Sequence, residues 1–237
     1  MYPDDSLQSL VGSWWIRTAD TEVRRGRLLQ AFVPHAEMIP LELVVEGRGD
    51  DPADHGRAKF RIQQLRISRP STAQGLPVAA LPHYPGEASL VQRAKNRLVL
   101  VIGQGGPEIP KPLRSGGANY QYTPFMSVAP YYGAESDGKR GGWKPEFVKR
   151  AKACEYPQVM WDMLPISTLT DESILRLDHV QPIGRHADSF KPTEFSLCED
   201  ALKILDDWQL WLQTGLLPED SVLFMYRQEL QRINLSG

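Results

Sequence analysis

The chain has 237 residues, of which 41% are hydrophobic and 24% are charged, and its formal net charge is -2. This composition is typical of a folded protein and argues against global disorder, and the slightly negative charge argues against a protein that coats nucleic acid through its overall charge. No apolar run approaches the roughly 20 residues that cross a bilayer, and the N-terminal MYPDDSLQSL has acids where a signal peptide needs a basic start. We therefore expect a cytoplasmic protein that does not enter a membrane.

The two cysteines, Cys154 and Cys198, have no CxxC or histidine-rich spacing around them. The sequence therefore predicts neither a disulfide framework nor a structural zinc site, and we expect no metal and no cofactor. At this length the chain can form one large domain, or one domain with a substantial extension.

Residues 1–70 are predicted to form an N-terminal extension made of a helix and a β-hairpin. The apolar residues of LQSLVGSWWIRTA, residues 7–19, fall near one helical face. The segments MIPLELVVEG (38–47) and AKFRIQQLRIS (58–68) are strand-like and flank a loop rich in Gly, Asp and Pro, so they predict a hairpin. Residues 71–85, in a stretch rich in proline and glycine, are expected to form a connector.

Residues 86–195 are predicted to form a small antiparallel β-barrel. Short apolar segments bounded by Gly, Pro or Asn recur there, which is typical of a barrel or a sandwich: GEASLVQRA, NRLVLVIG, FMSVAP, QVMWDMLP and SILRLDHVQPI. Two longer polar segments interrupt them. Residues 103–124 are rich in Gly and Pro, and loops of that length are often functional, whereas residues 131–157 contain a predicted short helix with Pro145 in its first turn.

Residues 196–237 are predicted to form two C-terminal helices packed on the barrel. Ser196 and Glu199 have the spacing of a capping box, and an apolar stripe follows on one helical face. Gly215 is expected to end this helix and Pro218 to open the second one.

The order of segments, rather than any single motif, indicates a family. The sequence has no GK[ST] after its glycine-rich GQGGPEIP, and it has no GxSxG, HExxH or kinase set. From residue 86 it runs GEASLVQRAKNRLVLVIG, FMSVAPYYGA, YPQVMWDMLP, ESILRLDHVQPIGRHA and FKPTEFSLCEDALKILDDWQLWL. This order resembles the MazF/PemK (Kid) toxin family over roughly residues 84–214, because that family has a GE or GD strand, an RP strand, a VxPxT strand, a DQV strand and a C-terminal helix.

The resemblance implies an α+β fold with a small antiparallel SH3-like β-barrel, a homodimer, and cleavage of single-stranded RNA without a metal. Cleavage in the family uses an arginine at the start of the RP strand and a Thr or Ser on the following strand. Arg97 matches this arginine, although Leu98 stands in place of the proline. Pro130 matches the proline of VxPxT, but Tyr131 and Tyr132 follow it where a small hydroxyl side chain is expected.

Metal-free RNA cleavage needs a base for the 2′-hydroxyl proton, a cation for the charged phosphorane and an acid for the leaving oxygen. Arg97 suits the cation role because its planar fork holds a phosphate bidentately. His179, in the segment Asp178-His179-Val180 that matches DQV, is predicted to be the base or acid, since histidine changes charge near neutral pH. Tyr131 is a further catalytic candidate, and Tyr132 is predicted to donate hydrogen bonds or to stack on bases.

Each of these residues also has a structural interpretation. In this interpretation Arg97 is a surface charge at the start of a strand, and His179 is a hydrogen-bonded histidine within a strand. The two tyrosines are part of the packing of the barrel. The catalytic interpretation depends on whether they converge.

A basic stretch between two predicted barrel strands is a candidate RNA-binding surface. Its cations are Lys139, Arg140, Lys144, Lys149, Arg150 and Lys152. Trp143 and Phe147 lie between them, and a groove for single-stranded nucleic acid needs cations that follow phosphates and rings that stack on bases. We add Arg176, from the DQV-like segment, to this surface. A solvated amphipathic helix would give the same pattern.

These observations predict a MazF/PemK-like toxin-type protein that acts on single-stranded RNA as a metal-independent endoribonuclease, with an antitoxin or another complex partner. The alternative is a catalytically inactive nucleic-acid or protein-binding module of the same fold within a larger defence or regulatory complex. Its support is the missing Thr or Ser, a chain longer than is usual for the family, and Trp14, Trp15 and Trp211 as candidate contact residues. A third class, an enzyme unrelated to RNA, would need a preformed pocket.

Overall fold

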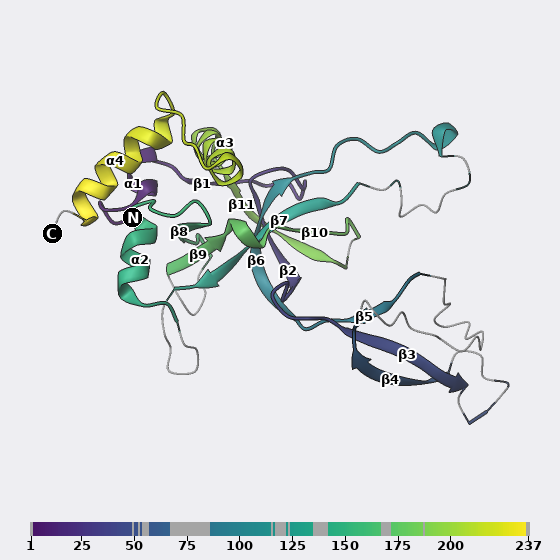
Figure 1. Ribbon diagram of the computed structural model, residues 1–237. Coiled ribbons are helices and arrows are strands. Elements are labelled where there is room, and N and C mark those ends of the chain that lie inside the picture. Colours follow the sequence, from purple (N-terminus) through teal and green to yellow (C-terminus); the bar gives the residue numbers. More distant parts are fainter. Residues whose placement is uncertain are drawn as a thin grey trace. The chain divides into compact units, whose positions relative to one another are not determined.

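The computed structural model describes residues 2–48, 50, 51, 53, 57–66, 86–114, 116, 122, 124–134, 142–166, 172–186 and 188–235. Within these residues the protein is α+β, as predicted, with a curled antiparallel half-barrel sheet, a smaller sheet and four α-helices (Figure 1). The chain divides into two compact units, unit 1 from Met1–Phe32 and Asn96–Gly237, and unit 2 from Val33–Lys95. The predicted connector at 71–85 lies outside the described residues. None of the described helices is long and apolar enough to span a membrane.

The large sheet has eight described strands, seven of which follow one path. In order across the sheet these are β1 (Trp15–Arg17), β11 (Phe190–Leu197), β2 (Arg27–Pro34), β6 (Ala94–Gly103), β7 (Met126–Gly133), β9 (Glu172–Arg176) and β8 (Val159–Met163). The eighth strand, β10 (Gln181–Ile183), also pairs with β7. Residues 99–102 of the central strand β6 are all buried, so this strand is covered on both faces.

The small sheet has the order β4 (Ala58–Gln64), β3 (Leu41–Arg48) and β5 (Ser89–Val91). The predicted hairpin is confirmed, because Leu41 pairs with Gln64 and Val45 with Phe60. The segment GEASLVQRA, residues 86–94, was predicted to be the first strand of the barrel. It contributes β5, which pairs with β3 of the small sheet. β6 begins only three residues after β5, so the chain passes directly from the small sheet into the large one.

The helix predicted over residues 7–19 is wrong beyond Val11. Helix α1 (Leu7–Val11) ends at Gly12, whose φ of 84° lies in the region that favours glycine. The chain then becomes extended, and Trp15 begins β1 opposite Leu197. Trp14 is 1% exposed. The apolar residues that were predicted to lie on one helix therefore belong to a short helix and to a strand. Side chains of the strand alternate between its two faces.

The two predicted C-terminal helices are confirmed, but their caps differ. They are α3 (Glu199–Thr214) and α4 (Val222–Leu235). Ser196 is a buried residue of β11, and the N-cap of α3 is Cys198, whose Sγ accepts a hydrogen bond from the backbone N–H of Ala201 at 3.4 Å. Gly215 ends α3 with a φ of 75°, as predicted. α4 begins after Ser221, not at Pro218.

The core of unit 1 lies on both faces of the sheet. Trp208 of α3 and Leu230 of α4 belong to one apolar cluster that includes Leu175 of β9. Helix α2 (Pro145–Lys152) packs in a second cluster with Ile174 of the same strand. Because neighbouring strand residues point to opposite faces, α3 and α4 cover one face of β9 and α2 covers the other (Figure 1).

A turn interrupts the segment predicted as one strand over residues 173–183. β9 ends at Arg176, a 3-10 turn, η3 (Leu177–His179), follows, and β10 begins at Gln181. Leu177 fixes the turn, because its side chain is 3% exposed and its backbone N–H donates to the Gln158 carbonyl at 2.9 Å. The charged residues of this apolar segment therefore lie at a break between two strands.

Candidate functional site

Five polar side chains from neighbouring elements meet on unit 1. They are Arg97, Tyr132, Arg176, Asp178 and His179, which we name the Tyr132 cluster. Their strands β6, β7 and β9 are adjacent in the sheet. Val99 opposes Pro130, and continuing this antiparallel register by two residues places Arg97 opposite Tyr132. Asp178 and His179 come from the turn η3 that follows β9.

Two guanidinium groups lie against one aromatic ring. The Cζ atom of Arg97 is 3.9 Å from the centroid of the Tyr132 ring, and that of Arg176 is 5.9 Å from it. Both distances are within the range in which a cation is attracted to the face of a ring. Two positive charges held on one ring also favour an anion beside them, so the pair is suited to a carboxylate or a phosphate.

The anion beside Arg176 in this structure is Asp178. Arg176 Nε donates to Asp178 Oδ1 at 2.7 Å, and Nη2 donates to Oδ2 at 2.6 Å, which is a bidentate pair. Partial burial would raise the pKa of Asp178, but the hydrogen bonds and charge of Arg176 outweigh it, so this pKa lies below its ordinary value. The five side chains of the cluster thus include two guanidinium groups and one carboxylate.

Arg176 also determines how His179 is protonated when its ring is neutral. Arg176 Nη2 lies 2.7 Å from His179 Nε2, and a guanidinium has only donors, so Nε2 accepts. The neutral ring then carries its proton on Nδ1, which lies 3.1 Å from Tyr132 Oη. His179 Nδ1–H therefore donates to Tyr132 Oη.

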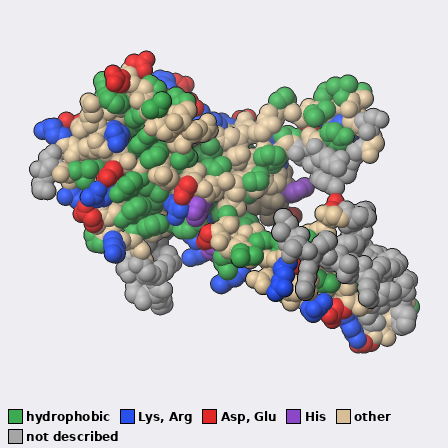
Figure 2. Space-filling model, in the orientation of Figure 1, with side chains coloured by type: hydrophobic (Ala, Val, Ile, Leu, Met, Phe, Trp, Pro, Cys, Tyr) green, Lys and Arg blue, Asp and Glu red, His purple; other side chains and the backbone are tan. Residues whose placement is uncertain are grey.

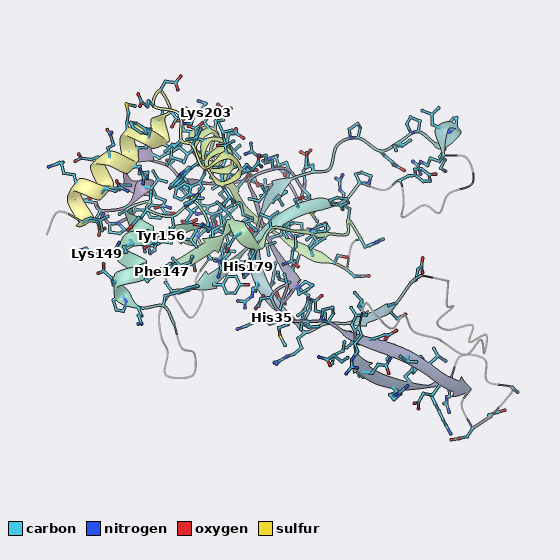
Figure 3. All side chains as sticks on the ribbon, viewed as in Figure 1. His35, Phe147, Lys149, Tyr156, His179 and Lys203 are labelled. Carbon is cyan, nitrogen blue, oxygen red and sulfur yellow. The ribbon has the colours of Figure 1, made fainter. Side chains whose placement is uncertain are left out.

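A column of aromatic rings adjoins the cluster. Trp143 stacks on Phe147 with a centroid distance of 4.7 Å, and Phe147 stacks on Tyr156 at 5.8 Å. The Cζ atom of Arg176 is 5.7 Å from the Trp143 ring, which connects the column to the cluster. Figure 3 shows Phe147 and Tyr156 beside α2, with Lys149 on the side of the helix that faces away from His179. Trp143 and Phe147 therefore stack on each other, and the expectation that they also stack on bases stays a prediction.

The predicted cations in and beside α2 differ in their exposure and in their ion pairs. Lys144 and Lys149 are exposed. Arg150 is bound to Glu146 at 2.9 Å and to Glu155 at 2.8 Å, and these partners raise its pKa. Figure 2 shows Lys and Arg side chains mixed with Asp and Glu over this part of unit 1. Lys152 Nζ lies 3.2 Å from Glu172 Oε1. Two further predicted cations, Lys139 and Arg140, lie outside the described residues.

The structure does not bring Tyr131 together with the cluster. Tyr131 neighbours Tyr132 on β7 and therefore points to the opposite face, where it is 5% exposed. Its hydroxyl donates to Asp162 Oδ2 at 3.1 Å, and the hydroxyl of Tyr2 donates to Oδ1 at 3.0 Å. Tyr131 thus belongs to an interior network that the sequence did not predict.

The centre of this network is a buried carboxyl group. Asp162 of β8 is 1% exposed, and burial raises its pKa to about 7 although the hydroxyls of Tyr2 and Tyr131 lower it. Burial and the nearby Asp162 also raise the pKa of Tyr131 well above its ordinary value, so its hydroxyl stays protonated. The feature of the sequence that pointed to this buried group was a single acid, Asp162, within the apolar strand VMWDM. Because this acid is isolated in the sequence, no neighbouring residue indicated its partners.

Two of the three tryptophans proposed as contact residues are interior. Trp14 is 1% exposed and Trp211 is 7% exposed. Trp211 packs against Trp208 at 5.8 Å, and Arg227 lies 5.1 Å from its ring. Trp15 is half-buried. The interpretation of Trp14 and Trp211 as a partner surface is therefore wrong.

Within the part of the chain that the structure describes, no group of three or more His, Cys, Asp or Glu side chains is placed to hold a metal ion. Searches against protein-family models, curated proteins and solved structures found no match to this chain. The resemblance to the MazF/PemK family therefore stays a prediction, and the Tyr132 cluster is the observation on which a function can be based.

Proposed function

We propose that this protein is a MazF/PemK-like, toxin-type endoribonuclease that binds single-stranded RNA at the Tyr132 cluster and cleaves it without a metal. The half-barrel sheet is taken in this proposal as a barrel of the SH3-like type. The observation that carries the proposal is the convergence of Arg97 and His179 on Tyr132. Arg97 is 3.9 Å from the ring of Tyr132, and His179 is 3.1 Å from its hydroxyl, although the two residues are far apart in the sequence.

Phosphate binding is the first step that the cluster supports. The guanidinium groups of Arg97 and Arg176 lie against one ring, and in this proposal one phosphate group accepts hydrogen bonds from both. Arg176 must then turn from Asp178 and from His179 Nε2 toward the phosphate. This movement exposes Nε2 as a base at the moment when the substrate is bound.

Proton transfer through His179 and Tyr132 completes the reaction. The 2′-oxygen of the RNA attacks phosphorus and its proton passes to His179 Nε2, while the bond from phosphorus to the 5′-oxygen breaks. The 5′-oxygen takes the proton of Tyr132 Oη, and the Nδ1 proton of His179 replaces it. His179 ends as the other neutral tautomer, and the products are a 2′,3′-cyclic phosphate and a 5′-hydroxyl. Arg97 stabilises the charge that develops on phosphorus.

Incubation of the purified protein with a long single-stranded RNA in EDTA tests this proposal. We expect discrete cuts whose ends are a cyclic phosphate and a 5′-hydroxyl. His179→Ala should slow cleavage by roughly 10²- to 10⁴-fold, because a general acid–base group is lost. Arg97→Ala should weaken both RNA binding and cleavage.

Lys203→Ala is a matched control, because Lys203 is an exposed cation on α3, paired with Asp200 at 2.8 Å (Figure 3). It should cleave as the wild type does. RNA that stays intact with all the proteins, or equal cutting by wild type and both cluster variants, would show that the Tyr132 cluster is not a nuclease site.

A second candidate is a module of the same fold that binds without cleaving. The observation in its favour is that Arg176 already has a bidentate carboxylate partner and covers His179 Nε2. No small hydroxyl residue follows Pro130, where the family resemblance requires one. Under this alternative the protein works within a larger defence or regulatory complex, and Arg97→Ala leaves binding of the protein partner unchanged.

Two further parts of the proposal rest on the resemblance alone. They are a homodimer and an antitoxin as partner, whereas the proposed cytoplasmic location rests on the sequence, which has no apolar run of about 20 residues. Sedimentation of the purified chain tests the dimer, and co-expression with a toxicity readout tests the need for an antitoxin.

A further inference from the structure

A cavity beside α2 lies next to the Tyr132 cluster and has no role in the proposed chemistry. Its volume is about 630 Å³, and its lining includes Trp143, Val148, Lys149, Lys152, Glu172 and Asn234. We name it the α2 pocket. All of these residues belong to unit 1. Its size falls within the roughly 300–1,000 Å³ that is usual for small-molecule sites.

The polar part of the α2 pocket holds a donor beside an acceptor. Lys152 Nζ lies 3.2 Å from Glu172 Oε1 and 3.8 Å from Asp5 Oδ1. These groups are partly shielded, since the side chains of Lys152 and Glu172 are 16% and 28% exposed. Lys152 is also fixed over the Trp161 ring at 4.6 Å. A ligand edge that presents an acceptor next to a donor can therefore bind both groups.

The other walls of the α2 pocket are apolar, and they are formed by Trp143, Pro145, Val148 and Ala134. A flat ring with polar atoms on one edge matches an apolar slot with a donor and an acceptor at one side. Nucleobases have this shape, and single-stranded RNA presents their edges to proteins because they are unpaired.

Trp143 connects the α2 pocket to the Tyr132 cluster. It lines the pocket, and its ring is 5.7 Å from Arg176 Cζ. A phosphate at Arg176 would therefore lie close to Trp143, one of the residues that line the pocket. Lys149, which is exposed and lines the pocket on the side of α2 away from His179, can meet a further phosphate of the same strand.

We infer that the α2 pocket takes a nucleobase adjacent to the phosphate bound at the Tyr132 cluster and sets the base preference of the protein. This inference rests on the proposed RNA-binding function. Glu172 accepts from a base N–H and Lys152 donates to a base oxygen or ring nitrogen. Trp143 and Val148 supply the apolar contact for the base ring.

The test measures binding of labelled uridine decamers that carry a single adenine, cytosine or guanine, beside the all-uridine decamer, by fluorescence anisotropy. We expect the wild type to prefer one base by roughly tenfold, which is the size of one hydrogen bond to a charged group. Glu172→Gln keeps the side-chain size and should reduce the preference to within about twofold of equality while RNA is still bound. Val148→Phe, which fills the pocket without a charge change, should do the same.

Glu219→Gln is the matched control, because it removes an equivalent charge from the exposed turn between α3 and α4. It should keep the wild-type preference. Equal binding of all decamers by the wild type, or an unchanged ranking in both Glu172→Gln and Val148→Phe, would overturn the pocket inference and leave RNA binding intact. A wild-type protein that binds no decamer would overturn the proposed function and the pocket together.

Discussion

The buried carboxyl group of Asp162 should make the stability of this protein depend on pH in an unusual direction. Burial raises the pKa of this group from 3.8 to about 7 in the folded protein. The folded state therefore holds the proton more tightly than the unfolded state does. The stability contributed by the protonated group is fully present below the unfolded pKa and is lost as pH rises through the folded pKa.

The shift corresponds to about 4 kcal/mol in total, at about 1.4 kcal/mol per pKa unit. Roughly 2–3 kcal/mol of this lies between about pH 5 and pH 8, and we expect the free energy of unfolding to fall by that amount across this window. Asp178 has the opposite shift, because its pKa is lowered, but it titrates below this window.

Urea unfolding of the wild type and of Asp162→Asn at several pH values measures the effect. Asparagine keeps the size of the side chain, and it can accept from one tyrosine hydroxyl and donate to the other. The variant should unfold with a nearly constant free energy across the window, because its amide stays neutral as the protonated Asp162 is at low pH, so the two curves should lie close together at low pH and separate as the pH rises. Parallel curves would refute the assignment of the pH dependence to Asp162.

Two further predictions concern the Tyr132 cluster. Tyr132→Phe keeps the ring on which Arg97 and Arg176 lie but removes the hydroxyl. We expect its RNA affinity, measured by fluorescence anisotropy, to stay within about threefold of the wild type. Its cleavage rate, measured by product formation, should fall by roughly 10²-fold or more, because the proton donor is lost. A Tyr132→Phe protein that cleaves at the wild-type rate would remove Tyr132 from the proton path. Asp178→Asn removes the carboxylate that competes with phosphate for Arg176, and we expect RNA to bind roughly three- to tenfold more tightly in the same anisotropy assay. Weaker binding by this variant would mean that Asp178 orients Arg176 for RNA instead of competing with it.

The sequence predicted those parts of the fold that depend on local chemistry. Gly215 ends α3 in the left-handed conformation that glycine favours, and Pro145 begins α2. The hairpin of β3 and β4 followed from alternating apolar residues on either side of a polar loop. In each of these cases the residues that decide the structure are near one another in the chain.

The errors arose where two local patterns are compatible with the same residues. The apolar spacing around Trp14 fits a helix, but Gly12 ends α1 and the chain continues as a strand. Ser196 and Glu199 have the spacing of a capping box, yet pairing with Arg27 holds Ser196 in β11, so Cys198 takes the cap position. Tertiary pairing decided both cases, and no local pattern contains that information.

The convergence of the Tyr132 cluster required both kinds of information. The family resemblance nominated Arg97 and His179, and Arg176 was added from the same DQV-like segment; the register of β6, β7 and β9 brings Arg97, Tyr132 and Arg176 to one face. The turn at Leu177 then carries Asp178 and His179 out of the strand, which explains why charged residues interrupt an apolar segment. The same alternation that places Tyr132 in the cluster sends Tyr131 to Asp162 on the opposite face. A one-residue change in the register of β7 would exchange the two tyrosines, so the identity of the candidate site depends on strand pairing as much as on residue type.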